Sequence, residues 1–181
     1  MGVRFRDGMQ SLTGVARSFG ANELIVSKTD LKGHITYTNE VFLRLAGYPE
    51  QEIVGAPHCI IRHPHMPHGM FRLLWDTLHE GREVFVFIVN RSQNGDHYWV
   101  FAHVTPSYDS AGNIIGYHSS RRNVDQEVLK HKVEPLYASM REEENKFSNP
   151  KDKAEAGVIF LKTMLQQKRM DYDEFIFSIY K

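Results

Sequence analysis

The chain has 181 residues, with 22 basic and 22 acidic side chains and ten histidines, so its formal net charge is zero. A neutral chain lacks the basic excess of a nucleic-acid-binding protein. Its single cysteine excludes an internal disulfide framework and is typical of a protein in a reducing compartment. No stretch of about 18 apolar residues, the length that a membrane-spanning helix needs, occurs in the sequence. We therefore expect a soluble, cytoplasmic protein with one folded domain and appended helices, without nucleic-acid partners or direct membrane insertion.

Residues 1–22 are weakly patterned, and we interpret them as an N-terminal cap of the folded domain. The pattern becomes regular from Glu23. Residues 24–26 and 34–37 are rich in apolar and β-branched side chains, and Gly33 supplies a turn between them. The sequence therefore predicts two short strands joined by a turn at the start of the domain.

Two short helices are predicted after these strands. Asn39 has a side chain suited to capping a helix over residues 40–46, which Gly47 ends. The segment from Pro49 to Val54 fits a second short helix.

A longer helix and a buried strand follow. From Pro67 to Glu80, apolar side chains recur every three to four residues, which predicts a helix with one inward face. Residues 84–89 are apolar on both alternations, so we expect a central strand that is covered on both sides and ends at Asn90.

Turn residues separate the last two predicted strands, which cover residues 97–107 and 114–121. The Asn94-Gly95 pair ahead of the first is a strong hairpin signal. Tyr98 and Trp99 alternate across that strand, so only one of them can face the interior, and the sequence does not say which.

Residues 123–181 are interpreted as a helical C-terminal extension without an output domain of its own. The first helix is expected to break at Pro135. The charged run 141–146 is interpreted as solvated, and helical spacing resumes over residues 158–165.

The loop of residues 59–67 places Arg62, His63 and His65 between prolines, directly before the longer helix. Proline restricts its own backbone and that of the preceding residue, and the start of a helix favours negative charge. Such a loop can bind an anion or a cofactor, although a surface loop rich in histidine has the same composition. A metal site is not indicated, because the histidine pair lacks a second ligand cluster at recognisable spacing.

The order of two strands, a helical middle and a three-stranded meander resembles the PAS sensor fold. That α+β fold has a five-stranded antiparallel sheet with a helical cap that encloses a ligand pocket. The resemblance covers residues 23–122 and is carried by Asn39-Glu40-Val41-Phe42 with Gly47-Tyr48, by Asn94-Gly95-Asp96-His97-Tyr98-Trp99, and by Gly116-Tyr117 with Arg121. The second of these, with Gly55-Ala56-Pro57-His58 and Arg62-His63-Pro64-His65-Met66-Pro67, resembles the flavin-binding domain of bacterial aerotaxis and energy-taxis receptors.

This resemblance implies a non-covalently bound FAD. In that family the matching positions associated with flavin binding are His58, Arg62, His63 and Asn90, and the position matching Trp75 lies near the pocket. Arg62 suits a pyrophosphate as a bidentate donor, and either histidine can donate to phosphate or ribose. Asn90 can present a donor and an acceptor to a polar ring edge. Trp75 offers an aromatic surface, although core packing alone would also account for it.

One departure from the family concerns His65, which stands where aerotaxis receptors commonly carry an acidic residue. A histidine cannot hold Arg62 by charge. Haem is therefore an alternative cofactor, because imidazole is a common axial ligand and His63, His65 and His68 all lie at the helix entrance.

Cys59 differs from the adduct-forming cysteine of the light-sensing PAS branch. That cysteine follows a glycine by three positions, whereas Cys59 lies one residue further from Gly55. We interpret Cys59 as a small buried apolar residue.

The resemblance thus implies a cytoplasmic redox or oxygen sensor that acts through protein contacts. Its partner would be a separate membrane-anchored chemoreceptor, another signalling protein or a second copy of itself. A haem-binding gas sensor and a ligand-free PAS interaction module are the alternatives. An enzyme such as a flavin reductase is not favoured, because the sequence has no glycine-rich nicotinamide fingerprint and no nucleophile and base motif.

Overall fold

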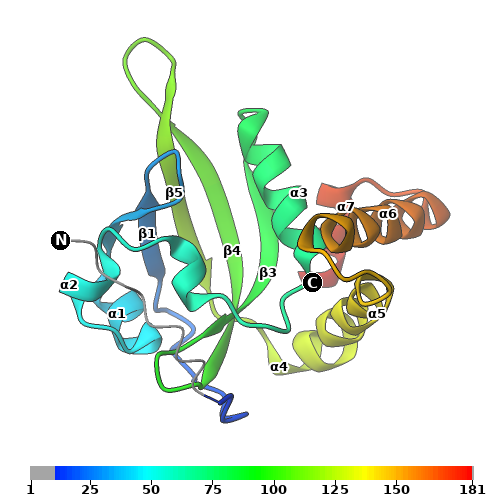
Figure 1. The fold of residues 1–181 in the computed structure, drawn as a ribbon, viewed down its shortest axis with the longest axis horizontal. Coiled ribbons are helices and arrows are strands. Elements are labelled where there is room, and N and C mark those ends of the chain that lie inside the picture. The colour runs from blue at the N-terminus through cyan, green and yellow to red at the C-terminus, as the bar shows by residue number, and fades with distance from the viewer. Residues whose placement is uncertain (1–10, 181) are drawn as a thin grey trace.

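The computed structural model describes residues 11–180, which form a five-stranded antiparallel sheet in the order β2-β1-β5-β4-β3 together with helices (Figure 1). The strands are β1 (Ile25–Thr29), β2 (Ile35–Thr38), β3 (Val84–Arg91), β4 (His97–Tyr108) and β5 (Ile114–Arg122). The helical segments are α1 (Glu40–Ala46), α2 (Glu50–Ile53), the 3-10 helix η1 (His58–Ile61), α3 (His68–His79), α4 (Gln126–Val128), the π-helix η2 (Leu129–Val133), α5 (Glu134–Glu144), α6 (Pro150–Lys168) and α7 (Tyr172–Tyr180). The predicted fold class is confirmed.

The sheet order differs from the chain order. β5 lies between β1 and β4, with Ile25 opposite Arg121 and Thr29 opposite Tyr117 in the pairing with β1. The expectation of a central strand ending at Asn90 was wrong: β3 is an edge strand and continues to Arg91. Helices cover both faces of this edge strand, so its apolar pattern reports burial and not its place in the sheet.

Asn39 fixes the position of α1 against the sheet. Its side-chain oxygen accepts hydrogen bonds from the amide of Phe42, 3.1 Å away, and from the amide of Val26 in β1. Its amide nitrogen donates to the carbonyl oxygen of Leu24. The predicted helix cap is confirmed, and the same side chain ties the helix to the first strand.

The two faces of β4 meet different helices. Tyr98, Val100 and Ala102 are buried on the face shared with the helical middle. On the other face, the Trp99 ring lies 5.9 Å from that of Tyr137 in α5, and Phe101 stacks on Tyr180 of α7. The inner face is therefore that of Tyr98, but the C-terminal helices bury part of the outer face as well.

The C-terminal helices gather beside β3 and α3 (Figure 1). Two tyrosine hydroxyl groups donate to carbonyl oxygens of the edge strand: Tyr137 to Phe87 at 2.5 Å, and Tyr172 to Phe85 at 2.7 Å. Within residues 11–180, no helix combines the length and apolar character needed to cross a membrane.

Two expectations for this extension were wrong. The helix does not break at Pro135, because the π-helix η2 precedes it and the proline falls in the first turn of α5, where a missing N–H is tolerated. The charged run is not uniformly solvated either, since Glu144 is only 1% exposed.

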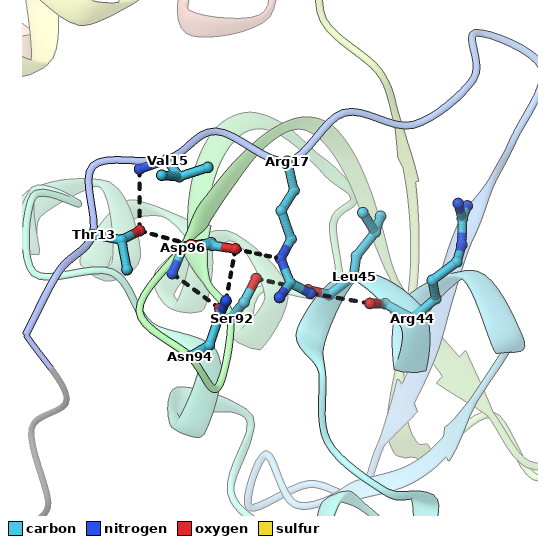
Figure 2. Close-up of polar contacts among 8 residues, drawn as sticks. All are labelled: Thr13, Val15, Arg17, Arg44, Leu45, Ser92, Asn94 and Asp96. Atoms are coloured by element: carbon cyan, nitrogen blue, oxygen red, sulfur yellow. Dashed lines mark hydrogen bonds and ion pairs between the residues drawn. The ribbon is translucent and has the colours of Figure 1, made fainter.

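The predicted N-terminal cap lies partly outside the described residues, but residues 11–17 run along the β3–β4 hairpin. Figure 2 shows Arg17 between Asp96 of that hairpin, at 3.0 Å, and the carbonyl oxygen of Leu45 at the end of α1, also at 3.0 Å. The amide of Thr13 donates to the carbonyl oxygen of Gly95. Hydrogen bonds from Thr13, Asn94 and Arg17 lower the pKa of Asp96 to about 2, so this junction is ionic at neutral pH.

Candidate cofactor site

A cavity of about 520 Å³ lies between the inner face of the sheet and α3. Its lining comes from β1, the β1–β2 turn, η1, α3, β3, β4, β5 and the start of α6. Much of its wall is apolar, formed by Phe71, Leu74, Trp75, Leu78, Ile88 and Val104. A cavity of this size and lining is typical of a small-molecule site.

Three buried polar groups on the floor of this cavity have no hydrogen-bond partner within the described residues. They are Nδ2 of Asn90 on β3, and Oγ of Ser119 and Nη1 of Arg121 on β5. Leaving a buried donor unsatisfied costs about 1–3 kcal/mol, so native proteins rarely keep several together without a ligand or ordered water. All three can donate, which indicates a ligand with acceptor atoms at this end.

Arg121 is the charged member of these groups, and only 3% of its surface is exposed. Its Nη2 atom donates to Oγ of Ser27 and to Nε2 of His58, both at 2.7 Å. Burial lowers the pKa of Arg121 to about 10, and within residues 11–180 no carboxylate pairs with it. The floor of the cavity therefore carries an uncompensated positive charge.

His58 is held in its neutral form by this environment. Burial, followed by the charge of Arg121, lowers the pKa of His58 to about 3. Because a guanidinium can only donate, Nε2 of His58 must be the acceptor and its proton must reside on Nδ1. His58 thus contributes a fixed tautomer to the site and adds no charge.

Basic side chains lie at the mouth of the cavity. The guanidinium of Arg62 lies 4.2 Å from the centre of the Phe71 ring, and the backbone of Arg62 pairs with that of Asn90. Lys32 and Arg72 line the same opening, although Arg72 is paired with Asp76. Burial lowers the pKa of Arg62, yet the group stays charged at neutral pH and favours an anion at the mouth.

Four of the five predicted site residues line this cavity: His58, Arg62, Trp75 and Asn90. Trp75 is half-buried, and its ring lies edge-on to that of Tyr117 at 5.4 Å. It therefore borders the cavity as well as packing in the core.

His63 lines a second cavity, of about 640 Å³, together with His65 and His97. Its Nδ1 atom accepts a hydrogen bond from the amide of His65 at 3.1 Å. Burial and the neighbouring positive groups lower the pKa of His63 to about 4. Among the described residues, no cluster of three or more His, Cys, Asp or Glu side chains could hold a metal ion.

The interpretation of Cys59 as a buried residue was wrong. Cys59 is exposed and lines the mouth of the first cavity, because η1 turns only Ile61 fully into the core.

Sequence reasoning missed the floor residues Ser27, Ser119 and Arg121 as site residues. A signal was present, because Tyr117, Ser119 and Arg121 alternate on one face of β5 and all line the cavity. Arg121 had been noticed only as part of a motif, since its role depends on the pairing of β5 with β1.

Comparison with known proteins agrees with this architecture. Residues 35–121 match a family model described as PAS fold. Residues 35–121 therefore have the PAS fold, and we call them the PAS domain. The chain is 43% identical over 117 residues to the aerotaxis receptor of Escherichia coli (strain K12), covering 64% of this chain and 22% of the receptor. It is 29% identical over 105 residues to a blue-light-activated histidine kinase of Rhizobium johnstonii, covering 58% of this chain and 30% of the kinase.

Solved structures similar to the PAS domain show the same fold. The dark structure of the blue-light photoreceptor Aureochrome1 LOV superposes with a TM-score of 0.56 at 24% identity, covering 64% of this chain and 86% of that one. Residues 35–121 thus have the PAS fold, and the chain is similar to parts of a receptor and of a kinase. The chain spans less than a third of the length of these two curated relatives.

Proposed function

We propose that this chain is a redox sensor that holds FAD non-covalently in the cavity above Arg121. The observation that carries the proposal is the set of three unpaired buried donors on the cavity floor: Asn90, Ser119 and Arg121. The polar edge of a flavin ring offers carbonyl oxygens flanking a ring N–H. Asn90 can both donate and accept, and the other two groups can donate to the carbonyl oxygens.

The remaining lining also fits this ligand. The apolar wall with Trp75 and Leu74 suits a flat aromatic ring system, and the mouth places Arg62 and Lys32 where a pyrophosphate would meet positive charge. A solved light-oxygen-voltage domain studied with a flavin analogue has a TM-score of 0.53 to this chain. A flavin analogue was thus studied with a domain of the same fold, which supports the proposal.

Haem fits the lining less well. Of the histidines that motivate haem, His63 and His65 line the other cavity. His68 borders the mouth, but its Nδ1 atom lies 3.2 Å from a carboxylate oxygen of Glu144. A ligand-free module is also disfavoured, since it would leave three donors unsatisfied beside an open cavity.

A bound flavin supplies reversible electron transfer. The protein's part is electrostatic: Arg121, as a fixed cation without a carboxylate partner, stabilises whichever ligand state carries more negative charge at its polar edge. His58 stays neutral, so it holds the guanidinium in place without competing for that charge. A change in ligand charge would thereby strengthen or weaken the electrostatic interaction between the ligand and Arg121.

We place this sensor in the cytoplasm, where it would signal to a separate membrane-anchored chemoreceptor, to another transducer or to a second copy of itself. Support comes from the similarity to an aerotaxis receptor and to a histidine kinase, which are signalling proteins.

The absorption spectrum of the purified full chain tests the proposal. We expect flavin bands, and FAD at about one molecule per chain after denaturation and chromatography. A Soret band would show that the bound cofactor is haem and not FAD. A colourless protein that neither retains nor takes up FAD would refute the proposal.

A further inference from the structure

The side chain of Glu144, the last residue of α5, caps the N-terminus of α3. One carboxylate oxygen accepts from the amide of His68 at 2.9 Å, and the other accepts from the amide of Gly69 at 2.8 Å. These are the first two residues of α3, whose amides have no partner within the helix. A negative charge at this place is favoured by the helix dipole, so the C-terminal extension caps the helix that forms the cavity wall.

The crossing of α3 and α6 depends on two glycines. A Cβ atom added to Gly69 would lie 2.6 Å from the carbonyl carbon of Gly157, and one added to Gly157 would overlap the carboxylate of Glu144. The two helices can therefore approach this closely only because both positions lack a side chain. The crossing also keeps α6 directly against Glu144.

Helices α5 and α6 also contact the cavity or the loop beside it. Pro150 and Ala154, in the first turns of α6, line the cavity beside Arg62 and His68. Arg141 of α5 donates to the carbonyl oxygen of His65 at 2.7 Å, within the loop that follows Arg62. Burial lowers the pKa of Arg62, and the charge of Glu144 acts in the opposite direction.

We propose that α5 and α6 belong to the cofactor site and that Glu144 is the positioning residue that holds them there. The ligand is the FAD of the proposed function. Because α6 supplies part of the cavity wall, a bound ligand contacts it only when Glu144 caps α3. Binding and docking of α6 are then linked, and by reciprocity FAD stabilises the docked helix as much as docking strengthens FAD binding.

Two measurements on the full chain test this link. The first is FAD titration of the wild type, Glu144→Ala and Glu144→Gln. We expect Glu144→Ala to weaken FAD binding about tenfold, because two helix-start amides lose their acceptor. Glu144→Gln, which keeps one acceptor of the same length, should restore part of this loss. Glu142→Gln on the exposed side of α5 is the matched control and should bind FAD like the wild type.

The second measurement is amide hydrogen exchange with and without FAD. In the wild type, FAD should slow exchange over residues 150–157 of α6 as well as around Arg62, and Glu144→Ala should lose the α6 protection selectively. If Glu144 had only a structural role, Glu144→Ala would lower the unfolding free energy, but FAD would still slow exchange over residues 150–157 in the variant. If Glu144→Ala fails to fold, Gly157→Ala displaces α6 directly, with Lys162→Ala at an exposed position of α6 as its control.

The outcomes separate the two proposals. A wild type that does not bind FAD would overturn the proposed function and this inference with it. A wild type that binds FAD without protecting residues 150–157, or a folded Glu144→Ala or Gly157→Ala variant with wild-type affinity, would overturn the coupling alone.

Discussion

Arg62 and His63 are neighbours in the chain, yet they line different cavities. The cavity of Arg62 contains three buried polar groups without partners, including a guanidinium nitrogen. The cavity of His63 contains none of the unpaired buried side-chain atoms found within residues 11–180, and the Nδ1 atom of His63 already accepts a backbone hydrogen bond. Unpaired buried donors, and not the number of histidines, therefore distinguish the cavity in which we propose the ligand binds.

The largest effect is expected from Arg121→Met, which removes the charged donor of the floor. FAD affinity should fall about 100-fold, because hydrogen bonds to charged groups contribute roughly 1.5–3 kcal/mol. The unfolding free energy of the ligand-free protein should change by less than about 1 kcal/mol, because the loss of an uncompensated buried cation offsets the loss of the hydrogen bonds to Ser27 and His58. Titration with FAD and chemical denaturation measure both quantities. Arg122→Met, at an exposed neighbouring position, is the control. A variant that loses stability but keeps FAD would assign Arg121 a purely structural role.

Arg62→Ala should have the next largest effect. FAD affinity should fall about 30-fold, since a charge-assisted phosphate contact at the half-exposed mouth is lost, while the domain stays folded. FAD titration and circular dichroism check this. Arg82→Ala, whose side chain pairs with Glu80 on the surface, should change nothing. Retention of FAD at wild-type affinity would remove Arg62 from the site.

His63→Ala should weaken FAD binding only about fivefold, although it is adjacent to Arg62. Its Nδ1 atom braces the loop through the amide of His65, so the loss is that of one partly buried hydrogen bond, about 1 kcal/mol. The same titration provides the comparison. A loss as large as that of Arg62→Ala would show that the two cavities do not act separately.

The smallest effect is a pH dependence of stability. The pKa of His58 is about 3 in the folded protein and 6.5 in its ordinary range, so only the unfolded chain takes up this proton between those values. The contribution of His58 to stability is therefore fully present well above pH 6.5 and falls on acidification, by about 1 kcal/mol between pH 7 and about pH 5.7. Denaturation as a function of pH should show a shallower slope for His58→Gln. The exposed His131→Gln is its control, and equal slopes in wild type and His58→Gln would contradict the assignment.

Local chemistry allowed much of the fold to be predicted. The Asn39 cap, the helix end at Gly47 and the Asn94-Gly95 hairpin depend on neighbouring residues alone, and all three are confirmed. The position of β5 between β1 and β4 could not be predicted in this way, because it depends on pairing between strands far apart in the sequence.

The candidate site likewise has residues that the sequence predicts and residues that depend on contacts between distant segments. The predicted residues His58, Arg62, Trp75 and Asn90 come together in one cavity, whereas the floor depends on the register that sets Arg121 near Ser27. Glu144 was part of a charged run whose composition is that of solvated surface. Only the packing of α5 and α6 against α3 reveals that it is buried.

The most direct test of the floor is the vibrational spectrum of FAD bound to the full chain, compared with Ser119→Ala and Arg121→Met. If the unpaired donors bind the polar edge of the flavin, the wild type should show carbonyl stretching bands at lower frequency than either variant, because hydrogen bonding weakens the C=O bond. Identical carbonyl frequencies in the wild type and both variants would show that these groups do not contact the flavin.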